Sequence, residues 1–470
     1  MEATQKQGQK SRKLPQYFAG VVAVVNTVTA GCVFGWTSPA LPHLQAPADN
    51  SSASAGGLTV DEGSLVGSLV AVGALAGSLP TGHLANLLGR RRLSQALSLL
   101  LVAGWAVIAV CGRQVVYLCA ARLLQGACLG AGSVVTPLYN EEISEVGVRG
   151  SLGVLYDSAL CLGILWVYLA GALAAPYLWM NVSCALPAAL SFLLLFLVPE
   201  SPVHLLARGD EAAARAALTW LRGGDPDVGP ELESLRRLVQ RPATPGRCAW
   251  TPPTAKALLI VTGLMMARQL SGINAVTFYA EDILRASGAG MEPSIAAMLC
   301  AVFELAVTVL MVVIADLAGR RLLLAVSCWG SALCLAGLAL APPGWLPVAS
   351  VLGYIGLFSV GLGPLPWFMM AELVPTEAKG WVTGVAATVN WLAMFLVTQF
   401  FVGLVRALGP AGTYAGYAAV NGLAGAGVLL FVPETRGKSL EDIQKELAGV
   451  KPAAPPDLGE PPHCRPRRED

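Results

Sequence analysis

Twelve apolar runs, each long enough to cross a bilayer, dominate this sequence of 470 residues. The hydrocarbon core of a bilayer is about 30 Å thick and a helix rises about 1.5 Å per residue, so about 20 apolar residues span it. Unpaired backbone groups are too costly in lipid, so each run is predicted to be a helix. The runs lie at 17–40, 64–88, 93–111, 115–138, 151–174, 178–198, 255–281, 293–316, 321–341, 346–371, 381–405 and 412–432. The sequence therefore predicts an all-α membrane protein with twelve transmembrane helices.

Composition supports a lipid-dissolved chain. Hydrophobic residues make up 55% of the sequence and charged residues only 13%, against about 25% charged in ordinary soluble domains. The net charge of +1 gives no reason to expect a nucleic-acid partner. The scattered cysteines form no metal-ligand pattern, and no nucleophile–base pair is visible. We therefore expect a protein that is not an enzyme and that needs no metal or cofactor.

Basic residues predict the orientation, because lysine and arginine stay on the cytoplasmic side of a membrane. With both termini inside, 26 of the 31 basic residues fall in cytoplasmic segments and three in outside loops. The expected division is a cytoplasmic N-terminus (1–16), a six-helix bundle (17–199), a cytoplasmic linker (200–254), a second bundle (255–433) and a cytoplasmic tail (434–470). Short surface helices are predicted at Glu211–Leu221 and Glu231–Val239. Asn50, in the first outside loop, is predicted to be a glycosylation acceptor, and we expect the plasma membrane as the location.

The two bundles repeat the same motifs at nearly one offset. GHLANLLGRR ends at Arg91 and IADLAGRR ends at Arg321, which lies 230 residues later. An acid and a basic residue seven positions apart also recur 230 residues later, as Glu142 with Arg149 and as Glu372 with Lys379. PESP and PETR follow at an offset of 234. The pattern indicates a duplicated six-helix unit.

Each copy places its motifs at a cytoplasmic helix end. We expect them to form ion-pair clusters that hold neighbouring helices together while the inner side is closed and that separate when it opens. The alternative is that the basic residues only set topology. His204, beside the first cluster, is expected at the surface. The residues assigned to gating in this way are Arg90, Arg91, Glu142, Arg149, Glu200, Arg320, Arg321, Glu372, Lys379 and Glu434.

Together these motifs resemble the sugar porter family of the major facilitator superfamily. The resemblance rests on GHLANLLGRRR, PESP, QLSGINAVTFY (269–279), DLAGRR, GLGPLPW (361–367), Asn390-Trp391 and PETRGKSL, and covers roughly residues 17–445. GWTSPALP (35–42) and RKLPQY (12–17) look most like facilitated trehalose transporters and facilitative glucose transporters. The resemblance implies the major facilitator fold, with two six-helix repeats, and a carrier for a sugar or polyol.

The resemblance also implies a site. Neutral sugars are held by side chains that both donate and accept hydrogen bonds, with an aromatic face against the C–H surface. Gln269 and Asn274 match sugar-binding amides, Asn390 matches a further polar contact, and Trp367 matches an aromatic near the inner gate. Gly363, Pro364 and Pro366 would let their helix bend, and Phe278 and Tyr279 would form the outer aromatic gate.

Three sugar-binding amide positions of the family carry charged residues here: Asp157, Arg268 and Glu304. An ionisable group at a helix centre costs about 2.5–3.5 kcal/mol on insertion scales, so such groups pair or line water. We expect a mutual network in which Arg268 pairs with Glu304, because their helices are consecutive. A packing pair unrelated to transport and a transporter that has lost its activity remain alternatives.

The expected function is facilitated diffusion of a hexose or trehalose by alternating access, for which a monomer suffices. Proton-coupled relatives keep an Asp on the first helix near an Arg on the fourth, and here Arg122 is present without that acid. A proton-coupled sugar or polyol symporter, with Asp157 as the proton carrier, is one alternative. A non-transporting solute sensor is another.

Overall fold

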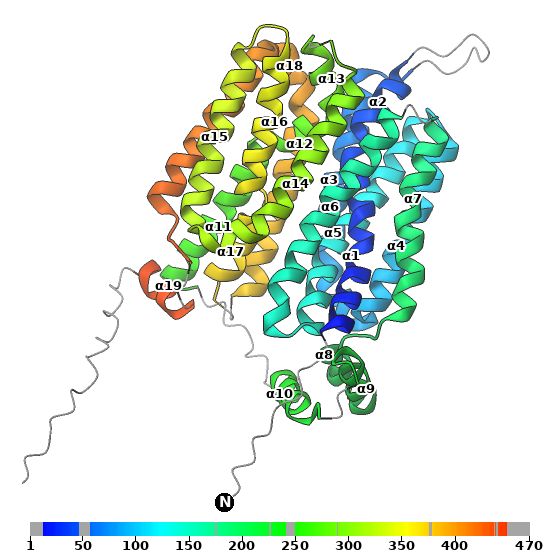
Figure 1. Ribbon diagram of the computed structural model, residues 1–470, viewed down its shortest axis with the longest axis vertical. Helices are drawn as coiled ribbons and strands as arrows, with labels where there is room; N and C mark the ends of the chain where they lie inside the picture. Colours follow the sequence, from blue (N-terminus) through cyan, green and yellow to red (C-terminus); the bar gives the residue numbers. More distant parts are fainter. Residues whose placement is uncertain are drawn as a thin grey trace, which may run out of the picture.

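The computed structural model describes residues 13–46, 57–173, 176–224, 227–240, 250–288, 290–375, 378–436, 438 and 440–448. The regular structure in these ranges is helical (Figure 1). The first half contains α1 (Leu14–Gly35), α2 (Thr37–Gln45), α3 (Val60–Leu88), α4 (Arg90–Cys111), α5 (Val115–Ile143), α6 (Val146–Ala172) and α7 (Tyr177–Leu194). The second half contains α11 (Pro252–Leu270), α12 (Ile273–Phe278), α13 (Ala280–Ala286), α14 (Pro293–Leu317), α15 (Arg320–Leu340), α16 (Trp345–Val360), α17 (Leu365–Leu373) and α18 (Lys379–Phe431).

Eleven helical segments of the described chain are long and apolar enough to cross a membrane. The last of them, α18, has 53 residues and is interrupted at Gly409, whose φ of +72° is not helical. Glycine adopts this left-handed backbone without steric cost, so the chain reverses there and α18 makes two crossings. The twelve-helix major facilitator fold predicted from the sequence is thus confirmed, and the protein is an integral membrane protein.

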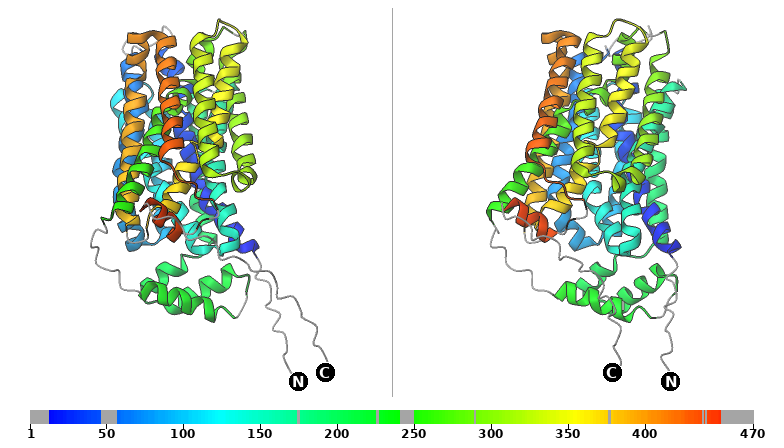
Figure 2. Two further views of the ribbon diagram at one scale, coloured as in Figure 1. Left: turned by 90° about the vertical axis from the view of Figure 1, so that its left-hand side faces the viewer. Right: turned by 60° about the vertical axis from the view of Figure 1, so that its left-hand side comes forward.

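Between the two sets of spans, α8 (Pro202–Ala207), α9 (Glu211–Leu221) and α10 (Gly229–Gln240) pack together beneath the first half (Figure 1). They lie below the spans in both views of Figure 2. The surface helices predicted in the linker are therefore present. A short helix, α19 (Leu440–Leu447), lies at the same end of the bundle (Figure 1). We call this end the lower end, and the opposite end, which carries α2 and α13, the upper end.

Small residues bring helices of the first half close together. A Cβ added to Gly126 or Gly130 of α5 would collide with the backbone carbonyl of Val70 or Ala74 of α3. In lipid, where apolar burial does not drive helix association, such close backbone contact is what holds helices together. This packing accounts for part of the high glycine content of the chain.

The halves contact each other through α3 with α18 and through α6 with α14. The hydrogen bonds and ion pairs that join them, in the part of the chain that the structure describes, lie at the upper end and in the middle. Asp61 Oδ1 lies 2.7 Å from Arg406 Nη1, and Ser68 Oγ donates to Gln399 Oε1 at 2.5 Å. Cys161 Sγ lies 3.5 Å from Thr308 Oγ1 at mid-height. In this arrangement the upper end is closed.

Candidate functional site

Three amide side chains predicted to bind substrate form one hydrogen-bonded chain in the second half. Gln269 Nε2 donates to Asn390 Oδ1 at 2.8 Å, and Asn274 Nδ2 donates to Gln269 Oε1. Gln269 and Asn390 are each 1% exposed. The structure thus brings together Gln269 at the end of α11, Asn274 in α12 and Asn390 in α18.

A break between α11 and α12 makes this meeting possible. Gly272 has a φ of +93°, and its Cα lies so close to the ring of Tyr417 that a Cβ would sit 3.0 Å from it. The carbonyl of Ser271, freed by the break, accepts hydrogen bonds from Tyr354 OH at 3.0 Å and Asn421 Nδ2 at 3.2 Å. These two bonds replace the missing helical ones and fix the turn, which directs Gln269 and Asn274 toward each other.

The side chain of Asn390 has a buried donor group that the amide chain does not use. Its Nδ2 is enclosed and has no hydrogen-bond partner among the described residues. The amide orientation is assigned from the bond that Asn390 Oδ1 accepts from Gln269. A buried donor without a partner costs about 1–3 kcal/mol, and a ligand oxygen would remove this cost. The amide chain therefore has a donor ready for a hydroxyl group.

The second helix break of this half lies between α16 and α17. A Cβ on Gly361 would lie 2.6 Å from the Ser327 Cβ, so only glycine permits this approach to α15. Pro364 and Pro366 begin α17 without needing helical N–H bonds. Gly363, Pro364 and Pro366 thus sit at a real interruption of the helix, as expected, and their role in bending stays a prediction. Trp367 follows on α17, half-buried against the apolar core rather than in the amide chain.

The charged trio is arranged differently from the expectation. Arg268 Nε donates to the carbonyl of Gly363 at 3.2 Å, and the guanidinium lies 5.8 Å from the ring centre of Phe358. Within the described residues, Arg268 has no ion pair with Asp157 or Glu304 within 4.0 Å.

The expected Arg268–Glu304 pair is therefore wrong. The position of Arg268 and Glu304 on successive membrane spans does not bring them into contact. Arg268 instead donates to the carbonyl of Gly363, which lies in the break after α16. All three side chains are half-buried, and Asp157 and Glu304 lie on α6 and α14, the two helices that face each other across the halves. Asp157 and Glu304 thus lie on helices that form a contact between the halves, and the trio makes no ion pair among its members in the described chain.

Phe278 and Tyr279, predicted as an outer gate, lie at the upper contact. Tyr279 stacks on Phe401 of α18 with ring centres 5.0 Å apart, and its hydroxyl donates to Ser64 Oγ of α3 at 3.2 Å. Phe278 is 1% exposed. Tyr279 thus joins the two halves where the upper end is closed, and the gating role of both residues stays a prediction.

At the lower end, the first cluster is built around a buried ion pair. Arg90 Nη2 lies 2.8 Å from Glu142 Oε1, and their side chains are only 8% and 10% exposed. Ser201 Oγ donates to Glu142 Oε2. We expected such pairs to separate when the inner side opens. In this structure the pair is formed, and the hydrogen bonds between the halves lie closer to the upper end than the pair does. It joins α4 and α5, which belong to the same half, so closure at the upper end does not strain it.

Glu200 plays a part that the sequence reasoning missed. Its Oε1 accepts hydrogen bonds from the backbone N–H groups of Arg90 at 2.8 Å and Arg91 at 3.0 Å. Glu200 therefore caps the N-terminus of α4 rather than pairing with a guanidinium. Arg91 Nη1 instead donates to the carbonyl of Val198 at 3.1 Å, which ties α4 to the end of the first half.

His204 is a member of this cluster and not the surface residue we expected. It is 6% exposed, and its Nδ1 lies 3.1 Å from Arg90 Nη1. A guanidinium only donates, so His204 accepts through Nδ1 and is neutral. Burial lowers the pKa of His204, and the charges of Arg90, Arg208 and Arg92 lower it further, against the opposite effect of Glu200. Its place after PESP was the signal available in the sequence.

The second copy repeats the arrangement. Glu434 accepts from the backbone N–H groups of Arg320 at 2.9 Å and Arg321 at 3.2 Å, and Arg321 Nη2 donates to the carbonyl of Leu429. Burial raises the pKa of Glu434, but the backbone donors outweigh it and the pKa is lowered. Arg320 Nη2 lies 3.7 Å from Glu372 Oε1, a looser and more exposed pair than its counterpart. The duplication read from the sequence is thus also a duplication of contacts.

The remaining predicted residues are Lys379, Arg149 and Asn50. Lys379 is exposed at the start of α18. The side chain of Arg149 and the whole of Asn50 lie outside the described residues. Sequence reasoning missed Arg222 of the linker, whose Nε lies 3.3 Å from Glu145 Oε1 and whose Nη1 donates to the carbonyl of Ile143 at 3.2 Å. Arg222 thereby fastens the linker to the loop between α5 and α6.

Comparisons with known proteins agree with this architecture. Residues 17–447 match the sequence model of a family described as sugar (and other) transporter. The chain belongs to this family. The facilitated trehalose transporter Tret1 of Drosophila yakuba is 34% identical over 450 residues, which cover 92% of this chain and 52% of that protein. The Tret1-2 homolog of Drosophila sechellia is 33% identical over 453 residues and is covered to 92%. The family and these relatives are transporters and not enzymes.

Several of these curated family members are longer proteins, and the chain spans about half of their length. Among solved structures, the inward open conformation of the xylose transporter XylE from E. coli gives a TM-score of 0.78 at 23% identity, covering 92% of this chain and 99% of that one. The proton:xylose symporter XylE bound to 6-bromo-6-deoxy-D-glucose gives 0.74 at the same identity. These likenesses show the major facilitator fold. The resemblance to sugar porters stated from the motifs is confirmed.

Proposed function

We propose that this protein carries a hexose or trehalose across the membrane by facilitated diffusion, with the two halves rocking about a central site. The observation that carries the proposal is the buried amide chain with its unpartnered Asn390 donor, placed beside two helix breaks. Neutral polyhydroxyl substrates need groups of this kind. The match to the sugar (and other) transporter family and the names of the curated relatives support the same substrate class.

In this proposal, Gln269, Asn274 and Asn390 bind the sugar and Trp367 lies at the inner gate. Tyr279 and Phe278 close the upper end, which is the outer side. The clusters around Glu142 and Glu372 keep each half rigid, and α17 bends at Gly363. The lower end is cytoplasmic, because the basic residues of the sequence concentrate there, and the resident membrane is the plasma membrane.

Arg122 supports uniport rather than proton symport. It is fully buried, and its guanidinium donates to the carbonyl of Val33 at 3.0 Å, to Gln125 Oε1 at 3.1 Å and to Thr37 Oγ1 at 3.3 Å. Its charge also lies 4.9 Å from the ring of Trp36. Neutral oxygens thus accept the hydrogen bonds of this guanidinium, and its donors do not require a carboxylate as acceptor.

Proton coupling remains the second candidate, because Asp157 and Glu304 lie near the contact between the halves without an ion pair in the described chain. The experiment is uptake of labelled glucose, trehalose and myo-inositol into proteoliposomes at two external pH values. We expect saturable uptake of glucose or trehalose that does not depend on the proton gradient. Uptake driven by external acid and lost in Asp157→Asn would favour the symporter, and no uptake of any of the three would contradict sugar transport.

A further inference from the structure

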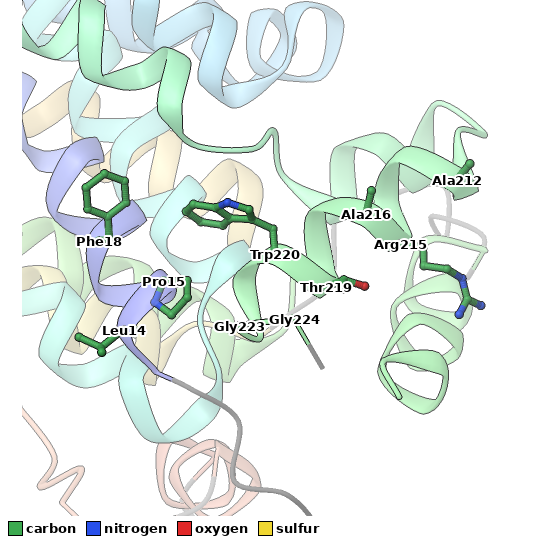
Figure 3. A pocket seen from close by; sticks show the side chains of 10 residues that line it. All are labelled: Leu14, Pro15, Phe18, Ala212, Arg215, Ala216, Thr219, Trp220, Gly223 and Gly224. Carbon is green, nitrogen blue, oxygen red and sulfur yellow. The ribbon is translucent and has the colours of Figure 1, made fainter. Parts of the chain in front are cut away.

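A groove at the lower end separates the first turns of α1 from the linker helix α9 (Figure 3). It has a volume of about 990 Å³ and is open along one side. Its walls consist of Leu14, Pro15 and Phe18 from α1 and of Ala212, Arg215, Ala216, Thr219, Trp220, Gly223 and Gly224 from α9 and the turn after it. The groove lies outside the amide chain and the clusters, and the transport mechanism does not use it.

The α1 wall continues the surface that faces lipid. Leu14, Phe18 and Val21 are exposed by 79%, 44% and 46%. Spacings of four and three residues place them on one face of the helix, and α1 is a membrane span. An apolar chain lying along this face would therefore run from the groove directly into the hydrocarbon layer.

The α9 wall adds an aromatic side chain of the kind found at membrane surfaces. Ala214, Ala217, Leu218 and Leu221 of α9 are buried within the protein, while Trp220 is 38% exposed. Trp220 leans toward Phe18, with ring centres 6.4 Å apart (Figure 3). Tryptophan prefers the level of the lipid headgroups, which is the level expected beside the end of a membrane span such as α1.

The groove also carries positive charge. Arg215 lines the groove on the α9 side and points away from the α1 wall (Figure 3). Glu211, one turn earlier on α9, lies 3.7 Å from Arg236 of α10 and so has a cation of its own. Within the described chain, Arg215 has no hydrogen bond or ion pair. Lys13, directly before α1, is exposed as well.

We propose that this groove binds one anionic glycerophospholipid, with the phosphate at Arg215 and one acyl chain along Leu14, Phe18 and Val21. The continuity of the groove with the lipid-facing side of α1 favours a lipid over a soluble ligand or a protein segment. The lipid would hold α9 against the membrane. Because Arg222 follows α9 and binds Glu145, the lipid would also steady the loop between α5 and α6.

The test uses the full chain, purified in detergent and titrated with phosphatidylserine or phosphatidylcholine while bound lipid is counted by native mass spectrometry. Wild type should bind phosphatidylserine more tightly than phosphatidylcholine. A basic residue near an anionic lipid surface contributes about 1 kcal/mol, so Arg215→Gln should weaken phosphatidylserine binding about fivefold. It should weaken phosphatidylcholine binding less, because the choline cation of that lipid already offsets the charge of its phosphate. Trp220→Ala should weaken both lipids, because it removes apolar contact and no charge.

Arg237→Gln is the matched control, since Arg237 is an exposed arginine on α10 that does not line the groove. Equal losses in Arg215→Gln and Arg237→Gln would mean only diffuse attraction and would overturn the proposal. So would equal affinity of wild type for the two lipids. A last measurement uses soluble glycerophosphoserine, which has the headgroup without the acyl chains. If it displaces phosphatidylserine completely at the same concentration, the groove recognises the headgroup alone, and the proposal of a lipid site is wrong.

Discussion

The buried ion pair between Arg90 and Glu142 should contribute much more to the free energy of unfolding than the equivalent pair of the second repeat, Arg320 with Glu372. Glu142→Gln removes the carboxylate that pairs with the Arg90 guanidinium at 2.8 Å, in a place where both side chains are about nine-tenths buried. Removing one partner of a buried pair costs about 3–5 kcal/mol, because the other charge stays desolvated. The pair of Arg320 and Glu372 is 3.7 Å long, with side chains 19% and 32% exposed. A longer pair that solvent can reach is screened and approaches the range of surface pairs, about 0–1 kcal/mol.

The assay is the apparent melting temperature of the detergent-solubilised protein, followed by size-exclusion chromatography after heating. One kcal/mol corresponds to about 2–4 °C for a unit of 150–250 residues, so Glu142→Gln should lower the midpoint by about 6 °C or more. Glu372→Gln is the matched control and should lower it by about 4 °C at most.

A double variant completes the test. Arg90→Gln with Glu142→Gln should be more stable than the sum of the two single losses, because it leaves no uncompensated charge. Equal shifts in Glu142→Gln and Glu372→Gln, or simple additivity in the double variant, would refute the argument that burial decides the strength of the two pairs.

Three further predictions follow from the site. Arg268→Gln restores an amide beside Gln269 and removes the bond to Gly363; hexose uptake should rise or broaden at equal surface expression, and unchanged specificity would count against Arg268 lining the path. Asn390→Leu removes the acceptor of Gln269 and the spare donor; at about 1–1.5 kcal/mol per lost hydrogen bond, KM for the sugar should rise about tenfold, and an unchanged KM would exclude Asn390 from the site. The pKa of His204 is lower in the folded protein than the value of about 6.5 in the unfolded chain. The stability that neutral His204 contributes is therefore fully present above the unfolded pKa and is lost as the pH falls toward the folded pKa. Thermal stability should therefore drop on acidification below about pH 6.5, and His204→Gln should lose this part of the pH dependence; an identical pH profile would contradict the neutral acceptor role.

Much of the fold could be predicted from the hydrophobic runs, because a single segment can cross the hydrocarbon layer only as a helix. The linker helix at Glu211–Leu221 was predicted with the bounds that the structure gives. The merging of the last two spans into α18 was not predicted, since the reversal depends on the backbone of one residue, Gly409. The amide positions Gln269, Asn274 and Asn390 came from motif resemblance, and their mutual hydrogen bonds came only from the break at Gly272.

The sequence by itself determined that this chain is a membrane protein of twelve helices, duplicated, with matched motifs at one end, because periodicity, charge bias and repeat offset are one-dimensional properties. Only the tertiary structure decided the partners of charged groups. Glu200 and Glu434 accept hydrogen bonds from the backbone N–H groups of helix N-termini and, in the described chain, do not pair with guanidinium groups. Arg268 donates to the carbonyl of Gly363 and does not pair with Glu304. A charge in a low-dielectric interior takes whichever partner the packing brings within hydrogen-bond reach, and sequence spacing does not specify that geometry.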